Sequence, residues 1–144
     1  MNRKKFIIIT TAGLFLVVGF ILSWAVYQRE DVAAKVSHVK NFTDENFEKE
    51  VVQASMKYPV LIDFYADWCF PCRMLEPIIA EVASELKGQA VIGKLDTDKN
   101  LIARRFGISK IPALFVIKDG EIKNAFYGVV TKETLVKALN ENGS

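Results

Sequence analysis

Short, mostly apolar runs alternate along the chain with segments whose apolar residues recur at helical spacing. The runs 60–66, 90–96 and 113–118 have the length and composition of strands buried on both faces of a sheet. Residues 68–86 have the pattern of an amphipathic helix, and shorter helices are predicted over 44–55 and 100–106. Thr131 can cap a last helix, and a short first strand is predicted at 36–39.

Asp119-Gly120 predicts a hairpin turn between the run 113–118 and a returning strand over 121–128. The element order is therefore βαβαβαββα. Alternating strands and helices predict parallel strand pairs covered by helices on both faces, and the terminal hairpin adds an antiparallel edge. The predicted fold class is α/β, with a mixed central sheet between two layers of helices.

The N-terminal part follows a different pattern, because residues 6–27 carry no charged side chain. As a helix, this segment spans about 33 Å, close to the bilayer core of about 30 Å. Trp24 and Tyr27 stand at its far end, where aromatic rings favour the membrane interface. Basic residues at 3–5 precede it, so the positive-inside rule predicts a cytoplasmic N-terminus and an extracytoplasmic C-terminal domain.

A cleaved signal peptide is the alternative interpretation of this segment. Ser23-Trp24-Ala25 has small residues at the spacing that a signal peptidase uses. The apolar stretch is longer than the usual 7–15 residues of such a peptide, which favours an uncleaved anchor. The expected organisation is a transmembrane anchor or signal sequence at 1–27, a tether and first strand at 28–41, and a folded domain at 42–144.

Charge and length narrow the class of the domain. The chain has 144 residues, 19 of them basic and 17 acidic. Three of the basic residues precede the apolar segment, so the remainder has a net charge of −1 and no sign of a nucleic-acid surface. About 117 residues follow the segment, enough for one compact core.

Cys69 and Cys72 are the only cysteines, and they stand at the start of the predicted helix 68–86. The partial positive charge at a helix N-terminus favours the thiolate, which is the reactive form of cysteine. A structural disulfide over so short a loop stabilises little, and half a zinc site lacks a second pair of ligands. The spacing therefore favours a redox-active dithiol that closes and reopens a disulfide.

The element order together with Trp68-Cys69-x-Pro71-Cys72 resembles the thioredoxin family. The likeness extends from about residue 42 to the C-terminus and includes features far apart in sequence: Asp63-Phe64, Pro77, Lys94, Ile111-Pro112, Gly120 and Gly128. It implies a thioredoxin fold and thiol:disulfide exchange without a cofactor. The N-terminal segment is not part of the soluble cytoplasmic thioredoxins, so the chain resembles a membrane-anchored, extracytoplasmic member.

The resemblance assigns roles to both thiols and to two charged residues. Cys69, at the exposed helix start, is the expected nucleophile, and Cys72, one turn inside, is the expected resolving thiol. Asp63 lies within an apolar run, where burial should raise its pKa, and it matches the family's proton acceptor for the second cysteine. Lys94 resembles the lysine that pairs with that Asp; a structural acid and a snorkelling lysine are the alternatives.

The same likeness predicts a substrate-binding surface around the dithiol. It implies a cis bond before Pro112 that faces the dithiol, and a docking groove formed by Trp68, Ile111 and Gly128; Trp68 could instead be a half-buried packing residue. Pro71 stiffens the helix start. Phe70 stands where thioredoxin commonly has glycine, and its ring can enlarge the contact with partners. Because Phe70-Pro71 offers no polar donor to stabilise a thiolate, the pair favours a reductant.

Three functions remain open at this point. The first is a membrane-anchored reductase of extracytoplasmic protein disulfides, recharged by a membrane thiol-transfer protein. The second is an oxidase or isomerase of secreted proteins, which differs in its reduction potential. The third is a non-catalytic binding module, for instance one that holds Cu(I) on two thiolates, although no His or Met cluster supports a metal site. His38, the only histidine, is expected to lie away from the catalytic residues.

Overall fold

The computed structural model describes Phe20, Ser23 and residues 38–143. Apart from Phe20 and Ser23, the predicted anchor at 6–27 lies outside the described residues. No helix among the described residues is long and apolar enough to cross a membrane. Ser37–Ser144 forms one compact unit, and it holds all the elements below.

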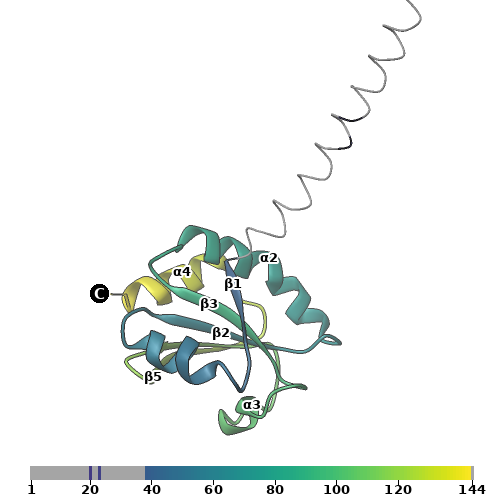
Figure 1. Ribbon diagram of the computed structural model, residues 1–144. Coiled ribbons are helices and arrows are strands. Elements are labelled where there is room, and N and C mark those ends of the chain that lie inside the picture. The colour runs from purple at the N-terminus through teal and green to yellow at the C-terminus, as the bar shows by residue number, and fades with distance from the viewer. Residues whose placement is uncertain (1–19, 21–22, 24–37, 144) are drawn as a thin grey trace, which may run out of the picture. The chain divides into compact units, whose positions relative to one another are not determined.

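A five-stranded sheet forms the centre of this unit, with the order β1-β3-β2-β4-β5 (Figure 1). Strands β1, β2 and β3 run parallel, whereas β4 is antiparallel to both β2 and β5. The strands are β1 (Val39–Phe42), β2 (Val60–Tyr65), β3 (Val91–Asp96), β4 (Ala113–Lys118) and β5 (Glu121–Tyr127). The helices are η1 (Glu48–Gln53), α2 (Phe70–Glu85), α3 (Ile102–Arg105) and α4 (Lys132–Glu141).

Two layers of helices cover the sheet, as predicted (Figure 1). One face packs against α2 and α4 through a cluster that includes Leu61, Leu75 and Leu135. The other face packs against η1 and α3 through a second cluster, which includes Ile62, Val51 and Ala103. Because side chains alternate along a strand, Leu61 and Asp63 of β2 point to the α2 face, while Ile62 points to the η1 face.

The direction of β4 corrects a prediction from element order. Alternation of strands and helices predicts a parallel strand at 113–118, but β4 runs antiparallel to β2. The helix before it, α3, has only four residues and extends about 6 Å, against about 20 Å for a six-residue strand. So short a helix does not return the chain along the sheet, and β4 starts near the end where β3 finishes.

The helix predicted at 44–55 also differs, because its first residues are engaged elsewhere. Residues 44–46 form a turn, and η1, a π-helix, covers Glu48–Gln53. The carboxylate of Asp44 accepts hydrogen bonds from the backbone N–H groups of Leu101 and Ile102, at 2.8 and 2.9 Å. Asp44 therefore caps the start of α3 rather than the helix that follows it in sequence.

The first strand lies three residues later than predicted, at Val39–Phe42. Its position follows from the packing of Phe42, which is buried and paired with Leu95 of β3. A Cβ atom on Gly93 would stand 2.5 Å from the Phe42 ring, so the glycine provides the space for that ring. The helix predicted at 68–86 is observed as α2 at Phe70–Glu85, so it differs only at its ends. Thr131 caps α4 as expected, accepting from the Thr134 N–H at 3.4 Å.

Candidate active site

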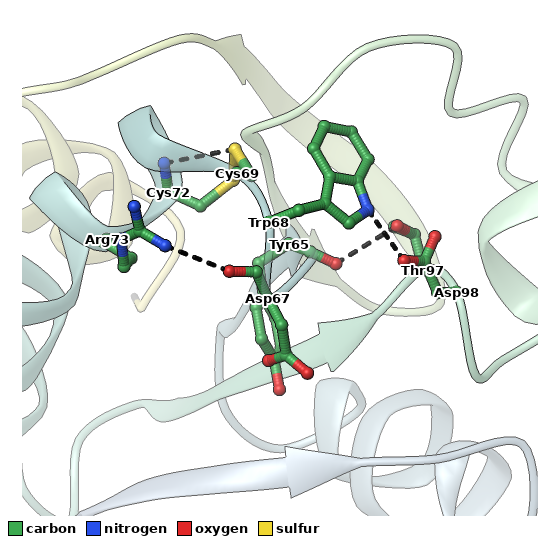
Figure 2. The surroundings of a disulfide bond; sticks show 8 residues. All are labelled: Tyr65, Asp67, Trp68, Cys69, Cys72, Arg73, Thr97 and Asp98. Carbon is green, nitrogen blue, oxygen red and sulfur yellow. Dashed lines mark hydrogen bonds between the residues drawn. A yellow bond between two sulfur atoms is a disulfide. The ribbon is translucent and has the colours of Figure 1, made fainter.

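Cys69 and Cys72 form a disulfide bond at the start of α2, with Cα atoms 5.3 Å apart. Cys69 is the N-cap residue of this 16-residue helix, and its backbone is extended. The Cys72 backbone N–H donates to Cys69 Sγ at 3.3 Å (Figure 2). In the reduced state this N–H and the helix dipole both favour a negative charge on Cys69 rather than on Cys72.

The two cysteines differ less in exposure than predicted. Cys69 is only 4% exposed and Cys72 is 2% exposed, so the expected exposed position of Cys69 is wrong for the disulfide form. Ala66 packs with both cysteines in a small buried cluster, and Tyr65 and Ile111 lie against it. What distinguishes Cys69 is therefore its place at the helix N-cap, not its accessible area.

Trp68 projects beside the disulfide and is 69% exposed, so it is not a half-buried packing residue. Its indole Nε1–H donates to Asp98 Oδ2 at 2.8 Å (Figure 2). Asp98 belongs to the loop after β3, where its backbone N–H donates to Asp96. Lys99 of the same loop pairs with Asp67 at 3.2 Å and Asp96 at 2.6 Å, which ties the loop to the turn before α2.

The turn before α2 has further hydrogen bonds of its own. The backbone N–H of Cys69 donates to the Ala66 carbonyl at 3.0 Å, and Arg73 Nη1 donates to the Asp67 carbonyl at 3.2 Å (Figure 2). These bonds restrain the segment between β2 and α2, which carries Trp68 and Cys69.

Ile111, Pro112 and Gly128 form a second connected group, of which Ile111 lies against the cysteine cluster. Ile111 packs against the cluster that contains both cysteines, and the bond between Ile111 and Pro112 is cis, as the resemblance implies. Pro112 is buried, and its carbonyl accepts from the Gly128 backbone N–H at 2.9 Å. Gly128 has a φ of 84°, a conformation that side-chain-bearing residues seldom adopt. The structure thus places Ile111 next to the cysteines and joins Gly128 to Pro112.

Phe70 and Pro71 lie between the two cysteines in sequence and occupy the first turn of α2. Both are exposed, with Phe70 at 65%. Met74, one turn further along α2, is also exposed, and the Arg73 guanidinium lies 5.6 Å from the centre of the Phe70 ring. Trp68, Phe70 and Met74 are thus exposed apolar side chains close to the disulfide in sequence, and the charge of Arg73 lies over the Phe70 ring.

Asp63 lies in the middle of β2 and is 2% exposed. Its Oδ1 atom has no hydrogen-bond partner among the described residues. Burial raises the pKa of the Asp63 carboxyl to about 7, against a smaller opposing effect of the Lys94 charge. A negative charge on Glu76 adds to the increase in pKa. Near neutral pH the group is thus able both to accept and to release a proton.

Lys94 is the Cα partner of Asp63 across the parallel strands β2 and β3. Its ammonium group, however, lies 3.9 Å from Glu76 Oε1 and 4.9 Å from the centre of the Tyr65 ring. Within the described part of the chain, no ion pair joins Lys94 to Asp63 directly. Lys94 and Asp63 therefore do not form the expected ion pair. The charge of Lys94 still lowers the pKa of Asp63 through space, while the ammonium group itself lies near Glu76 and Tyr65.

Glu76 and Asp98 are two acidic residues of this region that sequence reasoning did not single out. Glu76 follows Cys72 by four residues, which places both on one side of α2. That spacing is the signal in the sequence that could have identified it. Asp98 offers no comparable signal, because its contact with Trp68 joins residues 30 apart. Residues 38–143 contain no group of three or more His, Cys, Asp or Glu side chains placed to hold a metal ion, and His38 precedes β1.

Comparison with known proteins gives consistent matches over this unit. The family model described as Thioredoxin matches residues 38–141. Thioredoxin from Rickettsia bellii is 41% identical over 103 residues, which are 71% of this chain and 96% of that protein. Thioredoxin 1 from Synechococcus elongatus is 41% identical over 101 residues, 69% of this chain and 92% of its own length. Chloroplastic thioredoxin M4 from Arabidopsis thaliana is 34% identical over 113 residues, 78% of this chain and 58% of its own.

Proposed function

Because the chain belongs to the thioredoxin family and is a disulfide oxidoreductase, we propose that it is a membrane-anchored reductant of disulfides in extracytoplasmic proteins. The observation that carries the proposal is the Cys69–Cys72 pair at the N-terminus of α2, beside exposed Trp68 and Phe70. A disulfide at a helix N-cap is suited to opening and closing, and the exposed rings around it suit docking of a protein client.

The membrane anchor is proposed from the sequence. Residues 6–27 carry no charge, have the length of a bilayer core and follow a basic segment. On this basis the N-terminus is cytoplasmic and the unit Ser37–Ser144 is extracytoplasmic. The compartment outside the cytoplasm is one in which protein disulfides form and persist, so clients are available there.

In the first step of the proposed reaction, the Cys69 thiolate attacks one sulfur of a client disulfide. A new sulfur–sulfur bond joins Cys69 to the client, and the other client sulfur leaves as a thiolate and takes up a proton. The Cys72 backbone N–H and the α2 dipole stabilise the attacking Cys69 thiolate. Trp68, Phe70, Pro71 and Ile111 supply apolar contacts to the bound client, and Pro112 and Gly128 form the backbone wall of this site.

In the second step, Cys72 attacks the Cys69 sulfur of the mixed disulfide. The bond between Cys69 and the client breaks, the second client sulfur leaves, and the Cys69–Cys72 disulfide forms. Cys72 must first lose its proton, and Asp63 is the proposed acceptor because its pKa lies near neutral pH. The client gains two electrons and two protons, and the chain loses both.

The oxidised chain then needs a source of electrons. We assign this role to a membrane thiol-transfer protein, whose dithiol would reduce the Cys69–Cys72 disulfide by the same exchange chemistry in reverse. The direction of net transfer distinguishes this proposal from an oxidase or isomerase. Phe70-Pro71 places no polar donor between the cysteines that would stabilise the reduced thiolate, which favours the reducing direction.

The test is to trap clients and donor as mixed disulfides in intact cells that produce the full chain with Cys72→Ser. This variant keeps the nucleophile but lacks the resolving thiol, so mixed disulfides with its partners should accumulate. Mass spectrometry should identify these partners as exported proteins that contain disulfides. The matched control is the Cys69→Ser, Cys72→Ser chain, which should trap none. Partners that are all cytoplasmic, or equal recovery from both chains, would contradict the proposal.

A further inference from the structure

Among the described residues, the ammonium group of Lys94 lies near Glu76 and the Tyr65 ring, and no ion pair joins it to Asp63. Asp63 and Lys94 are directly opposed in the register of β2 and β3, so a lysine at this position is within reach of the carboxyl. The Lys94 side chain instead extends to Glu76 on α2, at 3.9 Å, and over the Tyr65 ring, at 4.9 Å. Glu76 therefore competes with Asp63 for the same positive charge.

A pocket of about 340 Å³ connects these three residues and opens to the surface. Asp63 lies in its buried part, while the side chain of Glu76 is 55% exposed and that of Lys94 is 33% exposed. The other lining residues are uncharged and come from β1 and α2: Val39, Asn41, Ile79 and Ala80. Glu76 and Lys94 are thus the charged groups in the described lining that act on Asp63, and Asp63 Oδ1 meets no hydrogen-bond donor among the described residues.

We propose that Glu76 is a positioning residue for disulfide exchange: by binding Lys94 it leaves the Asp63 carboxyl without an ionic partner and so keeps it able to take the Cys72 proton. A carboxylate in direct contact with an ammonium group is stabilised in its charged form and becomes a weaker base. The proposal rests on the proton-acceptor role assigned to Asp63 above. It adds that the strength of this base is set from α2, by a residue that acts through Lys94.

The proton balance of the resolving step is explicit in this arrangement. The S–H proton of Cys72 passes to the Asp63 carboxylate, the Cys72 thiolate attacks the Cys69 sulfur, and the client sulfur leaves with the electron pair. Asp63 then returns the proton to solvent through the pocket. A direct Asp63–Lys94 ion pair would oppose the first transfer, because it stabilises the Asp63 carboxylate before the reaction and not after it.

The central test is the Glu76→Gln variant of the full chain, oxidised and held in detergent micelles. Neither cysteine titrates in this form, because Cys69 and Cys72 are joined in the disulfide. The side-chain carboxyl of Asp63 is followed by ¹³C NMR as the pH is varied. Once Lys94 is released towards Asp63, the titration midpoint of Asp63 should fall by about one pH unit or more. Glu81→Gln is the matched control, because Glu81 lies on the same helix and faces Lys132, 4.0 Å away. It removes the same charge and should leave the Asp63 midpoint in place.

A second pair of variants separates positioning from simple charge removal. If Glu76 acts through Lys94, the effect of Glu76→Gln on the Asp63 midpoint should be much smaller when Lys94→Gln is also present. An unchanged midpoint in Glu76→Gln, or a shift of equal size with and without Lys94, would overturn the proposal. Rates of client release from the Cys69 mixed disulfide, measured against pH, should shift in the same direction as the midpoint.

The acceptor role of Asp63 and the positioning role of Glu76 are separable by experiment. If the Asp63→Asn variant releases the client at rates with an unchanged pH profile, the acceptor role of Asp63 is wrong. Glu76 can still control the titration of Asp63 in that case. If Asp63→Asn slows release but Glu76→Gln leaves both midpoint and profile unchanged, the acceptor role stands and the role of Glu76 is wrong.

Discussion

Asp63 places a carboxyl group inside an apolar strand, where its charged form is poorly solvated. Neighbouring residues stabilise the charged form only in part, because Asp63 Oδ1 has no hydrogen-bond partner among the described residues and Lys94 lies against Glu76. The result is a carboxyl whose pKa is raised to about 7, chiefly by burial. Such a position is expected to cost stability whenever the group is ionised.

Replacement of Asp63 by asparagine should therefore stabilise the oxidised chain increasingly as the pH rises. The pKa of Asp63 is about 7 in the folded chain and about 3.8 when unperturbed, so the folded state holds the proton more tightly. The stability from this binding is fully present below about pH 3.8 and is lost as the pH rises through 7. The gain from Asp63→Asn should grow by roughly 4 kcal/mol between pH 3 and pH 8.

Urea unfolding at several pH values measures this difference. Asp119→Asn is the control, because Asp119 is exposed and its φ of 56° is tolerated by asparagine. It should change stability little at any of these pH values. A gain from Asp63→Asn that does not depend on pH would show that Asp63 has an ordinary pKa in the folded chain.

The burial of Asp63 is predictable from the sequence, because Asp63 is the single acid in an apolar run of strand length. Its neighbours are harder to predict. The sequence places Lys94 on an adjacent strand, but the choice of Glu76 as its partner depends on how α2 packs over β3. The contact of Trp68 with Asp98 likewise depends on the loop after β3, for which no periodic pattern exists.

At the scale of elements, the fit of β1 against β3 depends on the absence of a side chain at Gly93. A Cβ atom there would stand 2.5 Å from the Phe42 ring and 2.9 Å from the Lys40 carbonyl. Gly93→Ala should therefore destabilise the chain by about 1–3 kcal/mol, through overpacking rather than backbone strain. Thermal and urea unfolding measure the loss.

A compensating variant tests the cause of that loss. Gly93→Ala together with Phe42→Leu removes the ring that the new methyl group meets. The two changes should cost less together than the sum of their separate effects. Additive losses would mean that Phe42 is not the residue against which Gly93 is packed.

Predictions of elements succeeded where a local pattern determines the result. The strand 113–118 was placed at its observed bounds because apolar residues and the Asp119-Gly120 turn delimit it. The helix at 44–55 was less accurate, since Asp44 caps α3, 57 and 58 residues away in sequence. The antiparallel direction of β4 was missed by the alternation rule because that rule assumes a crossover helix as long as the strands, and α3 has four residues.

At the scale of the whole molecule, the protein we propose consists of a membrane anchor at residues 6–27 and the folded unit Ser37–Ser144. The proposed topology predicts that a membrane-impermeant thiol reagent added outside intact cells labels Cys69 and Cys72 after mild reduction. The chain should fractionate with membranes and keep its full mass of 16.2 kDa. Labelling only after the membrane is permeabilised would contradict the topology, and a shorter chain in the soluble fraction would indicate signal-peptide cleavage.

The reduction potential of the Cys69–Cys72 pair tests the central claim most directly. The full chain is equilibrated with defined ratios of reduced and oxidised dithiothreitol, and the fraction of disulfide is measured by thiol alkylation and mass. A reductant is expected to have a potential near the value of about −270 mV that is typical of thioredoxin. A potential near about −120 mV, that of a strong oxidant, would contradict the account and make the chain a donor of disulfides instead.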